Sequence, residues 1–295
     1  MSSRPVIVAT DLTEHARPAI LAGRAHAAAI GEPLVVCHVV LDVFRNHPLI
    51  PDPRSNELLI ESNVIARAAE LASEQVHQTL GNLDGCRVVV ESGRPDEEIV
   101  QLADREDASL IVVGAKPREG TERVLGHVAE RVVRYAPGSV LVARATQATG
   151  KLLVTTDFSE GSLPALRVAQ QITRNGGEVT LVHAVTPVSS LWSSAFMPLG
   201  DTFSPPPKAA IDQLDALGRK TLENLAKEYG FARFEQLEGP PADSIIERAK
   251  TIGADMIVMG SRGRKGIARL VLGSVAEKVI RGSHCSVLVA REPQK

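Results

Sequence analysis

The stretch Asp255-Met-Ile-Val-Met-Gly-Ser-Arg-Gly263 is followed, after nine residues, by Gly273-Ser-Val-Ala-Glu-Lys-Val-Ile280. The apolar run that ends at Gly260 predicts a buried strand, and the stretch after Gly273 predicts a helix. Glycines at a strand end and at a helix start leave backbone N–H groups accessible to an anion. The segment therefore predicts a strand, an anion-binding loop and a helix in succession.

An altered copy of this segment lies upstream, where Gly114-Ala-Lys-Pro117 is followed by eight residues and then by Gly126-His127. A proline replaces the second glycine and a histidine replaces the serine. The stretches that close both copies are identical, because 139–144 and 286–291 both read Ser-Val-Leu-Val-Ala-Arg. A repeat of this length is a whole domain rather than a short solenoid unit.

The repeat divides the chain into two homologous domains, 1–147 and 148–295, joined near 145–150. Asp11 and Gly114 in the first domain correspond to Asp157 and Gly260 in the second, each pair 146 positions apart. A domain of this size has enough residues for its own hydrophobic core.

The composition is that of a globular protein, with 44% hydrophobic and 23% charged residues and a net charge of −2. This charge argues against a general nucleic-acid binder. The first domain has 15 Lys and Arg against 20 Asp and Glu, and the second has 18 against 15. Arg262, Arg264, Lys265 and Arg269 surround the intact glycine segment, where they either attract phosphate or form a solvated loop.

The chain has three cysteines without paired spacing, at Cys37, Cys86 and Cys285. Scattered thiols fit a reducing compartment better than a disulfide scaffold. The first residues lack an apolar h-region and a cleavage site, so we expect no secretion signal. No apolar stretch approaches the roughly 20 residues that span a bilayer. We therefore expect a cytoplasmic protein without a membrane partner.

Each half alternates strands with amphipathic helices. In the second half, strands are predicted at 151–155, 178–185, 234–237, 255–260 and 286–291, and helices at 162–172, 209–229, 242–250 and 275–280. Strand–helix alternation with continuous apolar strands predicts a parallel sheet covered on both faces. Right-handed crossovers make each half a doubly wound α/β domain.

Residues 186–208 interrupt this pattern with a long segment that holds Trp192, the only tryptophan. Loops of this length are usually functional or disordered. The segment either covers a ligand or partner surface or folds over its own sheet, and the sequence favours neither.

The residues of the second half resemble the universal stress protein family. The resemblance rests on Val154-Thr-Thr-Asp157 at the end of the first strand, Val182-His-Ala-Val185 at the end of the second, and Gly260-x-x-Gly263-x9-Gly273-Ser274. It covers the chain twice, as a tandem-domain member with the ATP-binding motif intact in the second domain only. The family implies a Rossmann-like, five-stranded parallel sheet in the order 3-2-1-4-5.

The resemblance also implies a nucleotide site in the second domain, where the first and fourth strands diverge. This place agrees with the general rule for ligands of open α/β sheets. Asp157 and the backbone of Ala184 would meet the adenine, and Gly260, Arg262 and Gly263 would border the ribose and phosphates. Gly273, Ser274 and Val275 would donate to phosphate at the helix start. The expected site residues are Thr156, Asp157, Ala184, Met259, Gly260, Arg262, Gly263, Gly273, Ser274 and Val275.

Several of these residues have structural alternatives. Asp157 is equally well explained as a turn or N-cap residue, and Ser274 as an N-cap. His38 and His183 end equivalent strands without a cluster of metal ligands, so buried structural histidines are favoured over a metal site. In the first domain, Pro117 cannot donate an N–H and His127 is expected to intrude on a phosphate. We expect that domain to be a degenerate partner domain.

The motifs of efficient phosphoryl transfer are missing. The chain has no GxxxxGK[ST] loop, no GxGxxG fingerprint and no G-x-S-x-G nucleophile elbow. The resemblance implies a stress-response regulator that binds ATP, AMP or ADP, with or without Mg²⁺, and the missing motifs favour binding with slow hydrolysis at most. The alternatives are a nucleotide-independent adaptor that binds a protein or apolar ligand through 186–208, and a weak ATPase.

The closing strands of the two domains predict how the domains associate. Unpaired apolar edge strands promote aggregation, and members of the resembled family commonly dimerise through this strand. We expect 139–144 to pair with 286–291 within the chain, as a covalent pseudo-dimer. Further association into a homodimer is left open.

Overall fold

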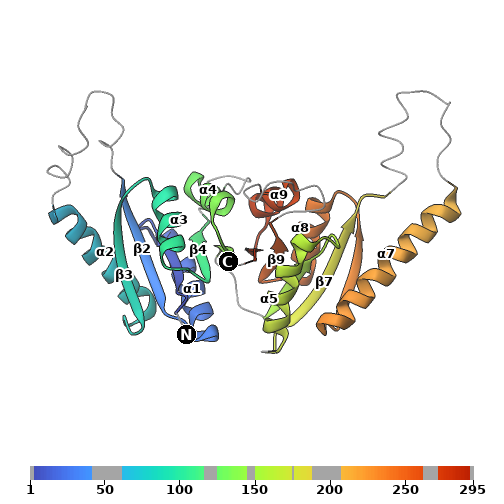
Figure 1. The fold of residues 1–295 in the computed structure, drawn as a ribbon, viewed down its shortest axis with the longest axis horizontal. Coiled ribbons are helices and arrows are strands. Elements are labelled where there is room, and N and C mark those ends of the chain that lie inside the picture. Colours follow the sequence, from blue (N-terminus) through green and yellow to red (C-terminus); the bar gives the residue numbers. More distant parts are fainter. Residues whose placement is uncertain are drawn as a thin grey trace, which may run out of the picture. The chain divides into compact units, whose positions relative to one another are not determined.

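A computed structural model describes residues 3–41, 62–115, 125–144, 150–174, 176–187, 207–261 and 272–292. The chain divides into two compact units (Figure 1). Unit 1 consists of Met1–Ala145 with Arg291–Lys295, and unit 2 of Thr146–Ala290. The predicted boundary after residue 147 falls within 145–149, outside the described residues.

Unit 1 alternates strands and helices as predicted. Its elements are β1 (Val6–Thr10), η1 (Glu14–Ala16), α1 (Arg17–Ile30), β2 (Leu34–Leu41), α2 (Ser62–Leu80), β3 (Cys86–Gly93), α3 (Pro95–Arg105), β4 (Leu110–Gly114), α4 (His127–Tyr135) and β5 (Val140–Ala143).

Unit 2 repeats this succession. Its elements are β6 (Lys151–Thr155), η3 (Glu160–Ser162), α5 (Leu163–Arg174), β7 (Glu178–Val185), α7 (Lys208–Tyr229), β8 (Arg233–Glu238), α8 (Pro241–Ile252), β9 (Met256–Gly260), α9 (Ser274–Gly282) and β10 (Ser286–Ala290).

The strands of both units have the same parallel order. In unit 1 the order is β3-β2-β1-β4-β5, and in unit 2 it is β8-β7-β6-β9-β10. Every registered pair within a unit is parallel. Numbered from the start of each unit, both orders are 3-2-1-4-5. The predicted doubly wound α/β fold is therefore confirmed. Pairing between 139–144 and 286–291 stays a prediction.

The core of each unit lies around its central strands. Val6, Ile7 and Val8 of β1 are fully buried, as are Leu153 and Val154 of β6. Such continuously apolar strands require helices on both faces. In unit 1, α1 packs against α2 and α3 packs against α4, and in unit 2 α5 packs against α7 and α8 against α9. These helices shield the sheet and leave the carboxyl ends of the strands for function.

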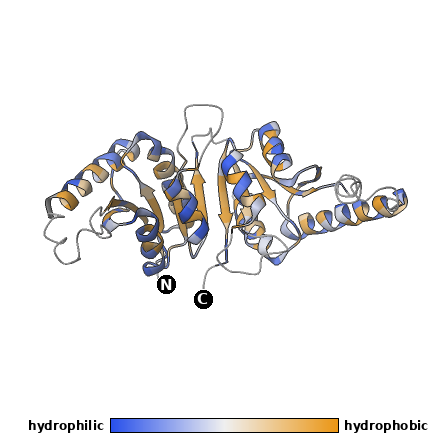
Figure 2. Ribbon diagram, turned by 90° about the horizontal axis from the view of Figure 1, so that it is seen from above, coloured by the Kyte–Doolittle hydropathy of each residue, from blue (hydrophilic) through white to orange (hydrophobic). Residues whose placement is uncertain are grey.

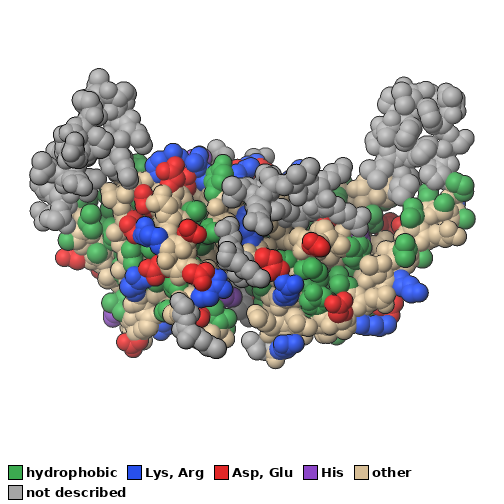
Figure 3. Space-filling model, viewed as in Figure 1, with side chains coloured by type: hydrophobic (Ala, Val, Ile, Leu, Met, Phe, Trp, Pro, Cys, Tyr) green, Lys and Arg blue, Asp and Glu red, His purple; other side chains and the backbone are tan. Residues whose placement is uncertain are grey.

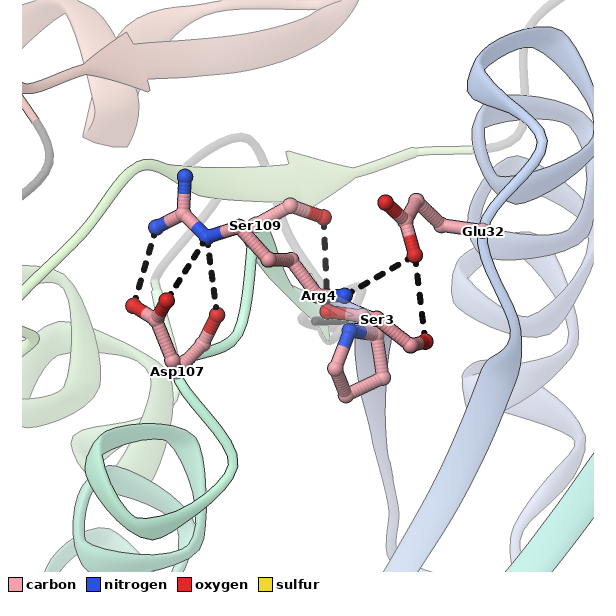
Figure 4. Close-up of polar contacts among 6 residues, drawn as sticks. Ser3, Arg4, Glu32, Asp107 and Ser109 are labelled. Atoms are coloured by element: carbon pink, nitrogen blue, oxygen red, sulfur yellow. Dashed lines mark hydrogen bonds and ion pairs between the residues drawn. The ribbon is translucent and has the colours of Figure 1, made fainter. Parts of the chain in front are cut away.

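The amino end of β1 is fixed by polar contacts of Arg4 and its neighbours (Figure 4). The Arg4 guanidinium donates to the Asp107 carboxylate at 3.0 Å, and its backbone N–H donates to Glu32 Oε2 at 2.9 Å. Ser109 N–H donates to the carbonyl of Pro5 at 3.0 Å. The Arg4–Asp107 pair is solvent-exposed, so it contributes about 1 kcal/mol at most. These contacts lie at the opposite end of the sheet from the strand ends described below.

Hydrophobic residues recur along α7 (Figure 2), and several are exposed over this helix (Figure 3). Leu214 and Leu217 are 58% and 62% exposed, whereas Leu222 and Ala226 are fully buried. The carboxyl half of α7 thus packs on unit 2, and its amino half presents leucines to solvent. The predicted helix at 209–229 agrees with α7, but only the carboxyl half of its apolar stripe is part of the core.

An ion pair ties α3 to α4 in unit 1. Asp96, at the start of α3, is 7% exposed and pairs with Arg131 of α4. The corresponding residues of unit 2 are Ala242 and Lys278. The pair therefore holds α4 to α3 in one half of the duplication.

Asp96→Ala, which copies the unit 2 residue, is expected to destabilise unit 1 by about 1–3 kcal/mol, because Arg131 loses its buried partner. Urea unfolding followed by circular dichroism, with hydrogen exchange of α3 and α4, measures this effect. Asp104→Ala on the exposed face of α3 is the control. Equal stability of the two variants would contradict a structural role for the pair.

Candidate functional site

The loop after β6 is shaped by a buried hydroxyl network. Thr156 Oγ1 accepts a hydrogen bond from Phe158 N–H at 3.0 Å and lies 3.0 Å from Ser162 Oγ. Phe158 adopts a φ of 63°, a left-handed conformation that is uncommon for a bulky residue. The network stabilises this conformation and turns the chain sharply at the carboxyl end of β6.

Asp157 serves the same turn. Its Oδ1 accepts hydrogen bonds from the backbone N–H and the hydroxyl of Ser159, at 3.1 and 2.5 Å. This is an Asx-type turn, in which the side chain stands in for a backbone acceptor. The structural alternative for Asp157 is therefore present, and its contact with adenine stays a prediction.

His183 on β7 joins the ends of two neighbouring strands. Its Nδ1 lies 2.8 Å from the carbonyl oxygen of Thr156. Because a carbonyl only accepts, Nδ1 carries the proton, and in the neutral ring Nε2 is an acceptor. The ring also contacts Phe158, with centroids 4.2 Å apart. Ala184 follows on β7, in register with Leu237 of β8.

Met259 and Gly260 close β9 beside this loop. Met259 is buried, and Gly260 packs directly against the backbone of η3. A Cβ at Gly260 would lie 2.1 Å from the carbonyl oxygen of Gly161. Close approach of two backbones, rather than strand exit alone, therefore requires this glycine. The end of β9 is consequently held close to η3, the segment that follows β6.

The start of α9 lacks a side-chain cap. Gly273 is the N-cap residue, with φ −67° and ψ 148°, and its N–H donates to the carbonyl of Ser261 at 2.9 Å. Ser274 is the first helical residue and is exposed. The alternative that Ser274 is the N-cap is therefore wrong. The first N–H groups of a helix have no intrahelical acceptor, so those of Ser274 and Val275 can serve a ligand.

The structure thus places Thr156, Asp157, Ala184, Met259 and Gly260 at the carboxyl ends of β6, β7 and β9, as predicted. Gly273, Ser274 and Val275 stand at the start of the helix that follows β9. The remaining predicted site residues, Arg262 and Gly263, lie outside the described residues, as do 188–206 of the predicted loop.

Unit 1 keeps the turn and the histidine of this arrangement. Asp11 Oδ1 accepts from the Thr13 N–H at 3.0 Å, and His38 Nδ1 donates to the Thr10 carbonyl at 3.0 Å. Leu12 has a φ of 62°, like Phe158. Both rings are half-buried rather than buried as predicted, and their bonds to strand-end carbonyls agree with a structural role. Over the residues that the structure describes, no group of three His, Cys, Asp or Glu could hold a metal ion.

The expectation that His127 intrudes on a phosphate in unit 1 stays a prediction. His127 is exposed as the first residue of α4, and it lines a cavity of about 430 Å³ with Gly114, Gly126 and Asp11. Pro117 lies outside the described residues.

Some contributors to the site escaped sequence reasoning. Thr156 was expected, but its hydroxyl partner Ser162 and the left-handed Phe158 were not. The only signal was the shared pattern of a hydroxyl residue two positions after Asp11 and Asp157, which is Thr13 in one half and Ser159 in the other. Such a pattern indicates an Asx-type turn.

Two of the three cysteines, Cys37 and Cys86, have thiols with a raised pKa. Burial, followed by the charge of Glu91, raises the pKa of the Cys37 thiol to about 12. Burial also raises the pKa of Cys86. Because the thiolate is the nucleophile, both thiols are unreactive near neutral pH.

Comparison with known proteins places these features in context. The model of the universal stress protein family matches residues 2–144 and 149–291. A universal stress protein of Methanocaldococcus jannaschii is 35% identical over 154 residues, covering 49% of this chain and 84% of that protein. The crystal structure of a universal stress protein from Archaeoglobus fulgidus shares the fold, with a TM-score of 0.66, 22% identity and 99% of both chains covered. A universal stress protein solved in complex with cAMP is 26% identical, with a TM-score of 0.33, over 48% of this chain and 96% of its own.

Proposed function

The chain belongs to the universal stress protein family, with two tandem copies of the family domain, and we propose that unit 2 binds ATP or a related adenine nucleotide as a regulatory ligand. The family assigns the chain a stress-response role. The choice of ATP and of unit 2 is the step that the proposal adds.

The observation that carries the proposal is the start of α9. This helix begins at a glycine cap, without a side chain satisfying its first N–H groups, directly after the strand that neighbours β6. The amino end of a helix carries about half a positive charge and favours phosphate. The β6–β9 edge is also the point where the chain turns to opposite sides of the sheet, the usual ligand position in such folds.

Adenine would lie toward Asp157 and Ala184 in this arrangement. Asp157 supplies a carboxylate for an exocyclic amine, and the backbone of Ala184 supplies a donor and an acceptor. Gly260, Arg262 and Gly263 would border ribose and phosphates. Mg²⁺, where it takes part, would be held by the phosphates, because the described residues form no cluster of metal ligands.

Regulation rather than turnover is the proposed role. Efficient phosphoryl transfer needs a positioned nucleophile and a clamp on the transferred group. The described site residues provide hydrogen-bond donors and one carboxylate that already shapes a turn. Any hydrolysis is therefore expected to be slow.

Titration calorimetry of the full chain with ATP is expected to give one site per chain, because only unit 2 has the intact glycine segment. Adenosine is expected to bind more weakly, since it lacks the phosphates that α9 would hold. Absence of heat at about 1 mM ATP would contradict the proposal. Two equal sites would contradict the assignment to one unit.

The adaptor alternative has one observation in its favour. The amino half of α7, which follows the segment 186–208, exposes Leu214 and Leu217. Exposed apolar side chains on one helix face are typical of partner surfaces. If titration with ATP gives no heat, the adaptor becomes the leading hypothesis. No helix among the described residues has the length and apolarity to cross a bilayer, and the cytoplasm stays a prediction.

A further inference from the structure

Unit 2 contains a cavity at the amino ends of its strands. The cavity has a volume of about 560 Å³, within the usual range for small-molecule sites. It is lined by the starts of β6, β7 and β8 and by the carboxyl end of α8. At about 3.3 Å per residue, the 8 residues of β7 separate this cavity from the carboxyl ends of the strands by roughly 20 Å. The cavity is therefore distinct from the site proposed for ATP.

Charged side chains from three strands and one helix meet at this cavity. Lys151 of β6 is in register with Glu178 of β7, and Glu178 forms an ion pair with Arg233 of β8. Glu235 lies two residues after Arg233, so both point to the same face of the sheet. Arg248 of α8 reaches Glu235 at 2.7 Å, so α8 covers this face. The fold thus collects five charged groups in one place.

The corresponding positions of unit 1 are apolar. The residue 146 positions before Glu235 is Val89, and the one 146 positions before Arg248 is Leu102. Leu102 is 2% exposed and belongs to the core of unit 1. Replacing packed apolar side chains by an ion pair rarely adds stability. Ligand recognition therefore gives the charged residues of unit 2 a role that stability does not.

The lining carries one positive charge in excess. Its charged residues are three cations and two carboxylates, namely Lys151, Arg233, Arg248, Glu178 and Glu235. Both arginines have carboxylate partners, whereas the Lys151 ammonium makes no ion pair with a described residue. Asp255, outside the lining, accepts the backbone N–H of Lys151 at 3.1 Å. Lys151 therefore offers a charge for a ligand.

Apolar side chains complete the lining. Leu152 of β6 is 5% exposed, and Ile252 closes α8. Phe234 of β8 is 42% exposed, so its ring is accessible from solvent. Aromatic and aliphatic surfaces of this kind hold the apolar part of a ligand, while the few polar groups fix its orientation.

We propose that this cavity is a second ligand site of unit 2, and that it takes a small organic carboxylate with an apolar body. The ligand carboxylate lies at Lys151 and the apolar body against Phe234 and Ile252. A single excess charge fits a monoanion, whereas the two lining carboxylates repel a doubly charged phosphate ester. The proposal goes beyond the nucleotide function and does not rest on it.

The probe is phenylacetate, a monoanion with an aromatic ring, and phenylacetamide is its neutral counterpart. An NMR titration of the full chain, followed through the backbone amides, is expected to shift the amides of Lys151, Arg233 and Thr251 with phenylacetate. The affinity for phenylacetamide is expected to be about tenfold lower, because it lacks the charge that Lys151 would bind. The amides of Asp157 and Ser274, at the carboxyl ends of the strands, should not shift.

Two variants remove the site in different ways. The double variant Glu235→Val, Arg248→Leu copies the residues of unit 1 and removes both partners of the ion pair, so neither charge is left unpaired. It should keep its melting temperature and lose phenylacetate affinity by about tenfold or more. Lys151→Gln should lose about tenfold. Lys250→Gln, an exposed residue of α8 outside the lining, is the matched control and should bind like the unchanged chain.

Three results would overturn the proposal. The first is the absence of amide shifts at about 10 mM phenylacetate. The second is equal affinity for phenylacetate and phenylacetamide. The third is unchanged phenylacetate binding in the folded double variant. Because ATP titration is a separate readout, the two proposals for unit 2 can fail independently.

Discussion

Ser274→Pro is expected to lower the affinity of the chain for ATP by about 10- to 100-fold, while the protein keeps its fold. Proline at the first helical position removes one backbone N–H and is compatible with the helix. Gly273, with ψ 148°, already has the extended conformation that a residue before proline adopts. The variant therefore removes a phosphate donor without disturbing α9, and calorimetry with ATP measures the loss.

Two further variants separate the backbone from the side chain and one unit from the other. Ser274→Ala removes only the hydroxyl and is expected to cost less than about tenfold in affinity. His127→Pro makes the same backbone change at the start of α4, where Gly126 has nearly the same dihedral angles as Gly273. It should leave ATP affinity unchanged. Normal ATP binding by Ser274→Pro would show that α9 does not hold the phosphates.

Gly260→Ala is expected to destabilise unit 2 by about 2–4 kcal/mol, because its Cβ would collide with rigid backbone. The nearest atom is the carbonyl oxygen of Gly161, at 2.1 Å, and the Cα of Ser162 lies at 3.1 Å. Relief requires a shift of η3, which carries Ser162 and its contact with Thr156. The melting temperature of unit 2 should fall by roughly 5–12 °C, and ATP affinity should fall with it. Calorimetric melting and ATP titration measure the two effects.

The matched control is Gly114→Ala in unit 1. There the added Cβ would lie 3.0 Å from the carbonyl oxygen of His15, a contact that a shift of a few tenths of an ångström relieves. We expect a cost below about 1 kcal/mol. If both alanine variants melt at the same temperature, the difference in backbone packing between the two units does not affect stability.

The sheet order and most element bounds could be predicted from the sequence. The predicted strands at 151–155 and 178–185 coincide with β6 and β7. Their continuous apolar runs predict strands that are buried on both faces of the sheet. The alternation of strands with helices predicts that these strands are parallel. The final strand of the first half, which begins at Ser139, recurs with the same sequence at Ser286. The two halves were therefore expected to have the same topology.

The geometry of the site could be predicted only in part. Asp157 was recognised from its place after a strand, but the left-handed Phe158 depends on buried hydroxyl contacts that no periodicity reveals. Ser274 looked like a helix cap because serine commonly caps helices, whereas the extended Gly273 takes that position.

The bond from a histidine ring to the preceding strand's carbonyl occurs in both units, at His38 and His183. The segments that follow β4 and β9 differ between the halves, with Pro117 and His127 in one and Gly263 and Ser274 in the other. The histidine side of each strand-end site is therefore the same in both units. The segment on the other side can change its residues without disturbing the histidine bond. A duplicated gene with this division of labour can acquire a second specificity by substitutions in one segment, and the fold of the altered copy survives the change.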